Sequence, residues 1–292
     1  MGQGASPPVV SQSAEATLTA RVARARVLAT EHPAAAELLT FYADLAEYQK
    51  GLLYSGAETP DLHLYTPAAF RDGLDLEPAL TAVPSFLHWL STRARAQTMD
   101  ADVNWREVIQ AYVTGATDGA PLLDPSTMLA VTLSSPKGQP PDPFVTFVAA
   151  ALVQPFAERL AAAWQKDAAG SQDSARCLVC GAAPVLGVLR PEGQGAKRAL
   201  VCSLCLTEHD YMRVICPACG ERRFEALPIY TAEQFDHVRI DACDSCHRYL
   251  KTIDLTKNGL AVPAVDDIAS VSLDLWARDR GYERLQRNLL GI

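Results

Sequence analysis

The chain has 292 residues, of which 49% are hydrophobic and 21% charged, and its formal net charge at pH 7 is −8. A chain of this length and composition buries a substantial core and is expected to form two domains. The acidic balance disfavours a nucleic-acid-binding protein, because such proteins contact phosphates through basic patches. Most of the excess negative charge lies in residues 1–176.

No stretch of the sequence reads as a membrane span. The longest apolar run, from Phe144 to Val153, is about half of the ~20 residues that a spanning helix needs, and Gln154 and Pro155 follow it. No signal peptide is recognisable. We therefore expect a protein of a reducing compartment, the cytoplasm, without membrane insertion.

The first half of the chain reads as helices. Between Ala34 and Tyr54, apolar residues recur at steps of three and four, which places them on one face of a helix. Segments rich in Gly and Pro separate this helix from others expected over residues 14–29, 80–95, 104–113 and 143–165. The sequence thus predicts an all-α domain over residues 14–165, after a disordered N-terminus (1–13) and before a polar linker (166–176).

All eight cysteines follow this linker, in four Cys-x-x-Cys pairs. The pairs are Cys177 with Cys180, Cys202 with Cys205, Cys216 with Cys219, and Cys243 with Cys246. A Cys-x-x-Cys turn directs two sulfurs at one point, and two such turns complete a tetrahedron of ligands. The spacing predicts two tetrahedral four-thiolate metal ions with all eight cysteines as ligands. A four-sulfur site suits iron and zinc equally.

Consecutive pairs are expected to share a metal ion. The first site then holds the pairs at 177–180 and 202–205, and the second those at 216–219 and 243–246, so that each site closes one local hairpin. A cross-braced arrangement, which interleaves the pairs, has to close two longer loops together at a greater cost in chain entropy. Four disulfides are the other alternative; they are disfavoured by the size of the chain and by the strict spacing within every pair.

The residue after each pair bears on the turn geometry. Gly181 and Gly220 follow two of the pairs, where glycine readily takes the positive φ of a tight turn. Leu206 and His247 occupy the same position in the other two pairs and suit it less well.

Short β-like runs flank the cysteines, and helical spacing returns near the C-terminus. The runs cover residues 184–190, 198–202, 224–230, 238–241 and 249–255. The predicted fold class is α+β: the N-terminal all-α helical domain, two small metal modules of the zinc-ribbon kind (177–210 and 211–265), and a C-terminal helix (266–292).

No catalytic constellation is recognisable in the sequence. The motifs of zinc proteases, serine hydrolases and phosphate-binding loops are absent, and the six histidines are scattered. His209 and His247 lie near cysteine pairs, but eight cysteines already fill two sites, so solvated or supporting roles are favoured. Asp266 and Asp267 form a carboxylate pair that a helix N-terminus would stabilise. We expect a protein that is not an enzyme, without catalytic or cofactor-binding residues other than the metal ligands.

The cysteine region resembles a known family. The run from Leu200 to Gly220 joins two cysteine pairs through a connector containing Glu208 and Arg213, and the segments 243–251 and 266–270 continue the pattern. Over residues 177–292 this combination resembles the formate dehydrogenase accessory protein FdhE. The chain departs from the family pattern at His209, where the family tends to carry a tryptophan.

The resemblance implies two rubredoxin-like metal centres after a helical domain. It also implies a cytoplasmic accessory protein that binds the catalytic subunit of a respiratory formate dehydrogenase during its maturation. The residues alone support a non-enzymatic metalloprotein with an acidic helical domain. Two further hypotheses are a rubredoxin-like iron protein that transfers electrons and a zinc-ribbon interaction module.

Overall fold

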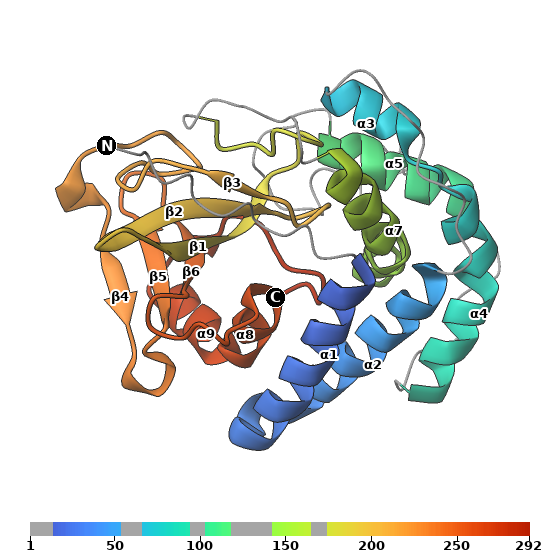
Figure 1. Cartoon of the computed structure of the whole chain (residues 1–292), viewed down its shortest axis with the longest axis horizontal. Coiled ribbons are helices and arrows are strands. Elements are labelled where there is room, and N and C mark those ends of the chain that lie inside the picture. Colours follow the sequence, from blue (N-terminus) through green and yellow to red (C-terminus); the bar gives the residue numbers. More distant parts are fainter. Residues whose placement is uncertain (1–13, 54–65, 94–102, 118–141, 165–173) are drawn as a thin grey trace, which may run out of the picture.

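The computed structural model describes residues 14–53, 66–93, 103–117, 142–164 and 174–292. A helical half and a half built around a β-sheet lie side by side (Figure 1). The predicted disordered N-terminus (1–13) and most of the predicted linker (166–176) fall outside the described residues.

The helical half confirms the predicted helices to within a few residues. The elements are α1 (Ala14–Glu31), the 3-10 helix η1 (Pro33–Ala35), α2 (Ala36–Leu52), α3 (Pro67–Gly73), α4 (Glu77–Arg93), α5 (Trp105–Thr117) and α7 (Pro143–Trp164). Helix α3 was not predicted, because it begins at Pro67 and ends at Gly73, within one of the Gly- and Pro-containing segments that were expected to separate the helices. In the structure Pro67 occupies the first turn, where its missing N–H costs nothing, and the Thr66 hydroxyl accepts a hydrogen bond from the Ala69 N–H at 3.1 Å.

Helix α7 corrects the expectation that no stretch has the length and composition of a membrane span. The helix runs through Gln154 and Pro155, so that Pro143–Ala163 reaches 21 residues with a mean hydropathy of 1.3. Its most apolar part is 72% buried inside the protein, where Leu152 and Phe156 pack among the side chains of the other helices. This burial is typical of the central helix of a helical core.

The second half is built on one sheet. Its strands are β1 (Pro184–Glu192), β2 (Gly195–Cys202), β3 (Glu208–Asp210), β4 (Ile229–Thr231), β5 (Val238–Cys243), β6 (Arg248–Asp254) and β7 (Glu283–Arg284). Their order is β3-β2-β1-β6-β5-β4, with β7 beside β6. The predicted strand over 224–230 is wrong in its first half, because Phe224–Ala226 forms the 3-10 helix η3 before β4 begins.

A parallel pairing between β1 and β6 joins the two cysteine modules. Each module contributes an antiparallel hairpin, β1–β2 and β5–β6, as expected for ribbons around metal sites. Gly187 of β1 lies opposite Thr252 of β6, and a Cβ at position 187 would overlap the Thr252 hydroxyl oxygen. The absence of a side chain at Gly187 therefore allows the two hairpins to form one sheet.

The C-terminal region contains two short helices in place of the single predicted one. They are α8 (Pro263–Ala269) and α9 (Val271–Asp279), separated at Ser270. The Lys251 ammonium reaches this break from β6 and donates to the carbonyl oxygen of Asp267 at 2.6 Å and to that of Ser270 at 3.4 Å. The Ser270 carbonyl also accepts a hydrogen bond from the Leu273 N–H at 3.0 Å, so the buried ammonium binds the chain where one helix ends and the next begins.

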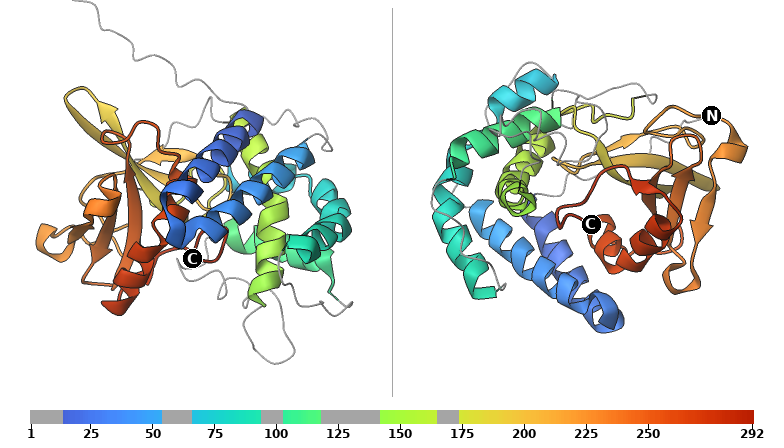
Figure 2. Two further views of the ribbon diagram at one scale, coloured as in Figure 1. Left: turned by 90° about the horizontal axis from the view of Figure 1, so that it is seen from below. Right: turned by 180° about the vertical axis from the view of Figure 1, so that it is seen from behind.

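Helix α8 also closes the helical half. Val265 and Ile268 pack against Ala25, Leu28 and Leu39 of α1 and α2. The C-terminal region thus covers an apolar face of the N-terminal helices, as Figure 2 shows from two sides.

The buried Lys251 belongs to an ion network that ties β6, α8 and α9 together. Its ammonium lies 3.0 Å from Asp267 Oδ1 and 2.5 Å from Asp274 Oδ2. Arg284 bridges the same two carboxylates, at 2.7 Å and 3.1 Å. Two buried cations thus face two buried anions, an arrangement in which the attraction offsets the cost of removing the charges from water.

Asp266 is equally engaged, so both members of the carboxylate pair have partners that the sequence did not reveal. Its carboxylate accepts hydrogen bonds from Arg24 of α1 at 2.6 Å and from the His237 ring at 2.8 Å. This hydrogen bond raises the pKa of His237 above its ordinary value of 6.5, with a further contribution from Asp236.

We expect Gly187→Ala to lower the free energy of unfolding by about 1–3 kcal/mol, the usual cost of overpacking. The cost should shrink when Thr252→Ala is present in the same chain, because the overlapping hydroxyl is then gone. Chemical denaturation of the two single variants and the double variant measures this coupling. Strictly additive losses would contradict the close approach of β1 and β6.

The raised pKa of His237 predicts a pH-dependent contribution to stability. The protonated ring stabilises the folded protein fully below pH 6.5, and this contribution is lost as the pH rises through the raised pKa. His237→Gln should therefore lower the melting temperature more at pH 6 than at pH 9. The matched control is His88→Gln, at an exposed position on α4. An equal loss at both pH values for His237→Gln would contradict the ion pair with Asp266.

Candidate metal centres

The eight cysteines gather in two groups of four. The groups are Cys177, Cys180, Cys202 and Cys205, and Cys216, Cys219, Cys243 and Cys246. Within each group the sulfurs all lie within 4.8 Å of one another. The structure therefore brings consecutive pairs together and does not interleave them.

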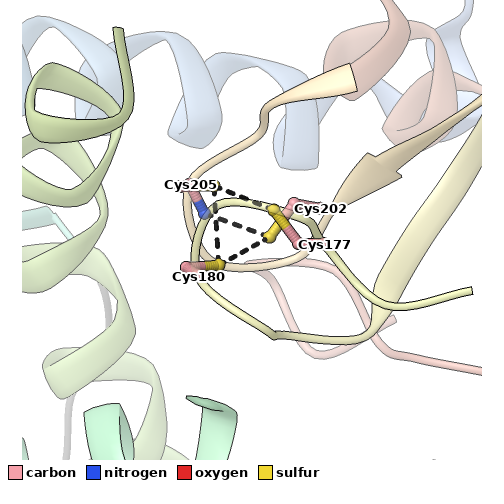
Figure 3. A group of neighbouring side chains, drawn as sticks. All are labelled: Cys177, Cys180, Cys202 and Cys205. Carbon is pink, nitrogen blue, oxygen red and sulfur yellow. Dashed lines mark hydrogen bonds between the residues drawn. The ribbon is translucent and has the colours of Figure 1, made fainter. Parts of the chain in front are cut away.

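The first cluster forms where the turn before β1 meets the end of β2 (Figure 3). The Sγ–Sγ distances are 3.7 Å for Cys177–Cys205, 3.3 Å for Cys180–Cys202 and 3.6 Å for Cys180–Cys205. A metal ion with four sulfurs at ~2.3 Å has ligands about 3.8 Å apart, whereas a disulfide bond is about 2.05 Å long. The spacing of the sulfurs fits a metal ion and not a pair of disulfides.

All four Cys-x-x-Cys turns adopt the same local conformation. The residue after the second cysteine has a positive φ in each: 79° at Gly181, 76° at Gly220, 52° at Leu206 and 55° at His247. Leu206 and His247 thus occupy the left-handed region in spite of their side chains, a conformation that is uncommon for residues other than glycine. The geometry of the turn therefore outweighs the preference of Leu206 and His247 for a negative φ.

Backbone N–H groups point at the sulfurs inside these turns. The N–H groups of Leu204 and Cys205 lie 3.3 and 3.4 Å from Cys202 Sγ, and that of Ala218 lies 3.4 Å from Cys216 Sγ. Such donors stabilise a thiolate, because they favour its charged form. The turns are therefore suited to hold ionised sulfur.

The first cluster is buried between the two halves of the molecule. All four cysteines are buried and belong to the same apolar core as Leu45 of α2, Ile109 of α5 and Leu160 of α7. Tyr112 of α5 lies close by: burial raises its pKa, and the neighbouring Cys202 and Cys180 raise it further. The helices and the sheet therefore meet at this cluster.

The environment shifts the pKa values of the thiols in the first cluster in different directions. Burial raises the pKa of Cys180 and Cys205, while hydrogen bonds from Cys180, Cys202 and Cys205 lower the pKa of Cys177. Burial thus opposes the ionisation of Cys180 and Cys205. A divalent ion would allow all four thiols to ionise, because it compensates charge that burial alone opposes.

The second cluster has similar geometry in a different environment. Its Sγ–Sγ distances are 3.8 Å for Cys216–Cys246 and 3.7 Å for Cys219–Cys243. Cys219 is exposed and Cys246 partly exposed, and burial raises the pKa of Cys246 to about 11. Cys216 and Cys243 are buried, so the second centre reaches the protein surface through Cys219 and Cys246.

A polar brace, not anticipated from the sequence, holds the two turns of the second cluster together. Glu221 follows the first turn and accepts a hydrogen bond from the Ser245 hydroxyl in the second turn at 2.6 Å. Arg223 donates to the same carboxylate at 3.0 Å. Only the folded structure brings Glu221 and Ser245 together, since 24 positions separate them.

Neither candidate histidine joins a cluster. Nε2 of His209 lies 3.2 Å from the carbonyl oxygen of Ser174, and burial lowers the pKa of the ring. The His247 ring packs near Tyr282, with the ring centroids 6.2 Å apart. Among the described residues, the groups able to hold a metal ion contain cysteine alone.

Comparisons with known proteins agree with this arrangement. Residues 176–213 match the family model "FdhE, central domain", and residues 202–290 match "FdhE, C-terminal domain". A relative from Aquifex aeolicus, called Protein FdhE homolog, is 42% identical over 116 residues, which are 39% of this chain and 41% of that protein. The two family models together cover residues 176–290, which contain all four cysteine pairs.

The similarity extends to the helical half in other proteins. The chain matches the crystal structure of the FdhE protein from Pseudomonas aeruginosa with a TM-score of 0.63 and 24% sequence identity, over 96% of this chain and 97% of that one, which shows a shared fold. A Protein FdhE homolog from Stutzerimonas stutzeri is 30% identical over 97% of this chain and 92% of its own length. With its two four-cysteine clusters and its full-length similarity to such relatives, the chain belongs to the FdhE family.

Proposed function

We propose that the chain is an accessory factor that binds the catalytic subunit of a respiratory formate dehydrogenase during its assembly in the cytoplasm. Membership of the FdhE family along nearly the whole chain carries this proposal. The chain itself is not an enzyme in this view. It acts by binding, and its cysteine clusters serve to fold the chain around metal ions.

We propose further that all eight cysteines are ligands of two tetrahedral ions, either iron or zinc. The sulfur spacing of 3.3 to 3.8 Å and the N–H groups directed at the sulfurs support this assignment. Four thiolates leave no open coordination position, so such an ion would stabilise the fold and not bind a substrate.

The two centres would have separate roles because their environments differ. The first would fasten the sheet to the helices, since its four cysteines are buried in their common core. The second would shape the surface formed by β4, β5 and β6, because its ligands flank that surface. Binding of the client would then depend on the second centre.

A rubredoxin-like electron-transfer role is the second candidate, and the exposure of Cys219 favours it. A metal centre at the surface can exchange electrons with a partner over a short distance. Visible absorbance that disappears on reduction and returns on oxidation would support this role for an iron-loaded protein. A zinc-loaded protein cannot take part in such a reaction, because zinc has no accessible redox change.

Replacing Cys216 and Cys219 by serine should remove one of two bound ions. The four sulfurs of the first centre should stay protected, because they lie in a separate cluster. Metal analysis gives the stoichiometry, and thiol labelling followed by peptide mapping identifies the released cysteines. Labelling at Cys202 and Cys205 would contradict the assignment, whereas labelling at Cys243 and Cys246 is the expected result.

In cells, the loss of the second centre should abolish the accessory role. A strain that carries Cys243→Ala and Cys246→Ala should lose formate-dependent dye reduction and pull-down of the catalytic subunit, with the client transcript unchanged. Full activity and pull-down in a variant shown to lack its second ion would refute the role of this centre. Full activity in a strain without the whole protein would refute the accessory function.

A further inference from the structure

A groove lies on the face of the sheet opposite α8 and α9. Along β6, Tyr249 and Ile253 pack towards α9, whereas Leu250 faces the other side, as expected for alternate residues of a strand. The groove opens on this other side, over Ile229 of β4 and Asp241 of β5. Figure 1 shows β4 at the end of the molecule remote from α4.

The walls of the groove concentrate exposed apolar side chains. Val214 is 46% exposed, Ile229 51% and Phe224 71%, and all three line the groove. Only seven large apolar residues are exposed in the described part of the chain, so nearly half of them meet here. Exposed apolar residues that cluster in this way mark an interaction site, whereas scattered ones need no explanation.

The same walls carry positive charge on an acidic protein. Four arginines line the groove, at positions 198, 213, 239 and 248, against one carboxylate, Asp241. Asp241 is already engaged by Arg198 at 3.2 Å and by Arg239 at 2.8 Å. Four thiolates and one divalent ion would carry a net negative charge at the second centre. This charge would offset only part of the excess positive charge of the arginines.

Arg213 is the cation left available at the rim. Its side chain is exposed and makes no ion pair among the described residues. The buried Arg198 guanidinium donates to the carbonyl oxygens of Met212 at 3.3 Å and of Ile215 at 3.1 Å. The backbone on both sides of Arg213 is therefore fixed before any partner arrives.

The second cysteine cluster forms one end of the groove. Cys216 and Cys243 belong to its lining, and η3, which carries Phe224, follows the Glu221 brace. Phe224 and Arg213 therefore flank the Cys216–Cys219 turn on its two sides. The geometry of the groove depends on that turn being held in place.

We propose that this groove is the docking site for a client polypeptide segment that offers an apolar side chain next to a carboxylate. The apolar side chain packs between Phe224, Val214 and Ile229, and the carboxylate pairs with Arg213. The proposal rests on the accessory function proposed above and names the surface through which that function is carried out.

The size of the groove favours a side chain over a cofactor. The cavity measures about 60 Å³, a few times the ~10–15 Å³ that one water molecule requires. Aromatic and arginine residues are also the types that dominate the energetics of protein–protein interfaces. A protein segment uses both the apolar walls and the charged rim, whereas a small anion would use the rim alone.

The test is the affinity of the purified, metal-loaded chain for the purified catalytic subunit of the formate dehydrogenase, measured by biolayer interferometry. Phe224→Ala and Arg213→Glu should each raise the dissociation constant about tenfold or more. Arg213→Glu should also reduce the dependence of binding on salt concentration. The matched controls are Leu260→Ala and Arg26→Glu, at exposed positions outside the groove, and these should change the constant less than twofold.

Both groove residues are exposed, so metal content and circular dichroism should match those of the unmodified chain. Unchanged affinity in both groove variants, with the unmodified chain binding normally, would overturn the docking site while leaving the accessory function intact. No binding by the unmodified chain would overturn the accessory function itself. A dimer of this chain that Phe224→Ala dissociates, seen by analytical ultracentrifugation, would also overturn the proposal, because the groove would then bind a second copy.

Discussion

The fold depends on the burial of one cysteine cluster where its two halves meet. Cys177, Cys180, Cys202 and Cys205 share their apolar surroundings with α2, α5 and α7, which come from the other half of the molecule. Four thiols that close together cannot all ionise inside an apolar core without a cation. The position of the sheet against the helices is therefore linked to the chemistry of a single group of sulfurs.

The same motif has two different environments in this chain. Each cluster is built from two Cys-x-x-Cys turns with a left-handed residue after the second sulfur. One cluster is enclosed by helices, whereas the other ends at an exposed Cys219 beside a groove with apolar and basic walls. The turn fixes where the sulfurs point, and the surrounding tertiary structure determines what the centre can contact.

Features set by neighbouring residues could be predicted from the sequence. The helices follow from apolar periodicity, and the grouping of the sulfurs follows from the spacing of the pairs, because both depend on local geometry. Features set by contacts between distant residues could not be predicted from the sequence. The parallel pairing of β1 with β6 places Gly187 opposite Thr252, and the carbonyls at the break near Ser270 bind the Lys251 ammonium from β6. Neither partner is visible from the segment that requires it.

The carboxylates of Asp266 and Asp267 also show that contacts between distant residues could not be predicted from the sequence. A helix N-terminus was sufficient to explain Asp266 and Asp267 from the sequence alone. In the structure Asp266 binds Arg24, 242 positions away, and Asp267 binds Lys251 and Arg284. A pattern of charges indicates that partners exist without identifying them.

The packing of α8 on α1 and α2 has a consequence for synthesis of the protein. Leu28 and Leu39 emerge early from the ribosome, but Val265 and Ile268, which cover them, emerge more than 220 residues later. At a translation rate of 5–20 residues per second, that interval is on the order of ten to fifty seconds. Throughout it, Leu28 and Leu39 lack the side chains that cover them in the folded protein. Helix α8 therefore acts as an intramolecular cover that forms only after residues 263–269 have been synthesised.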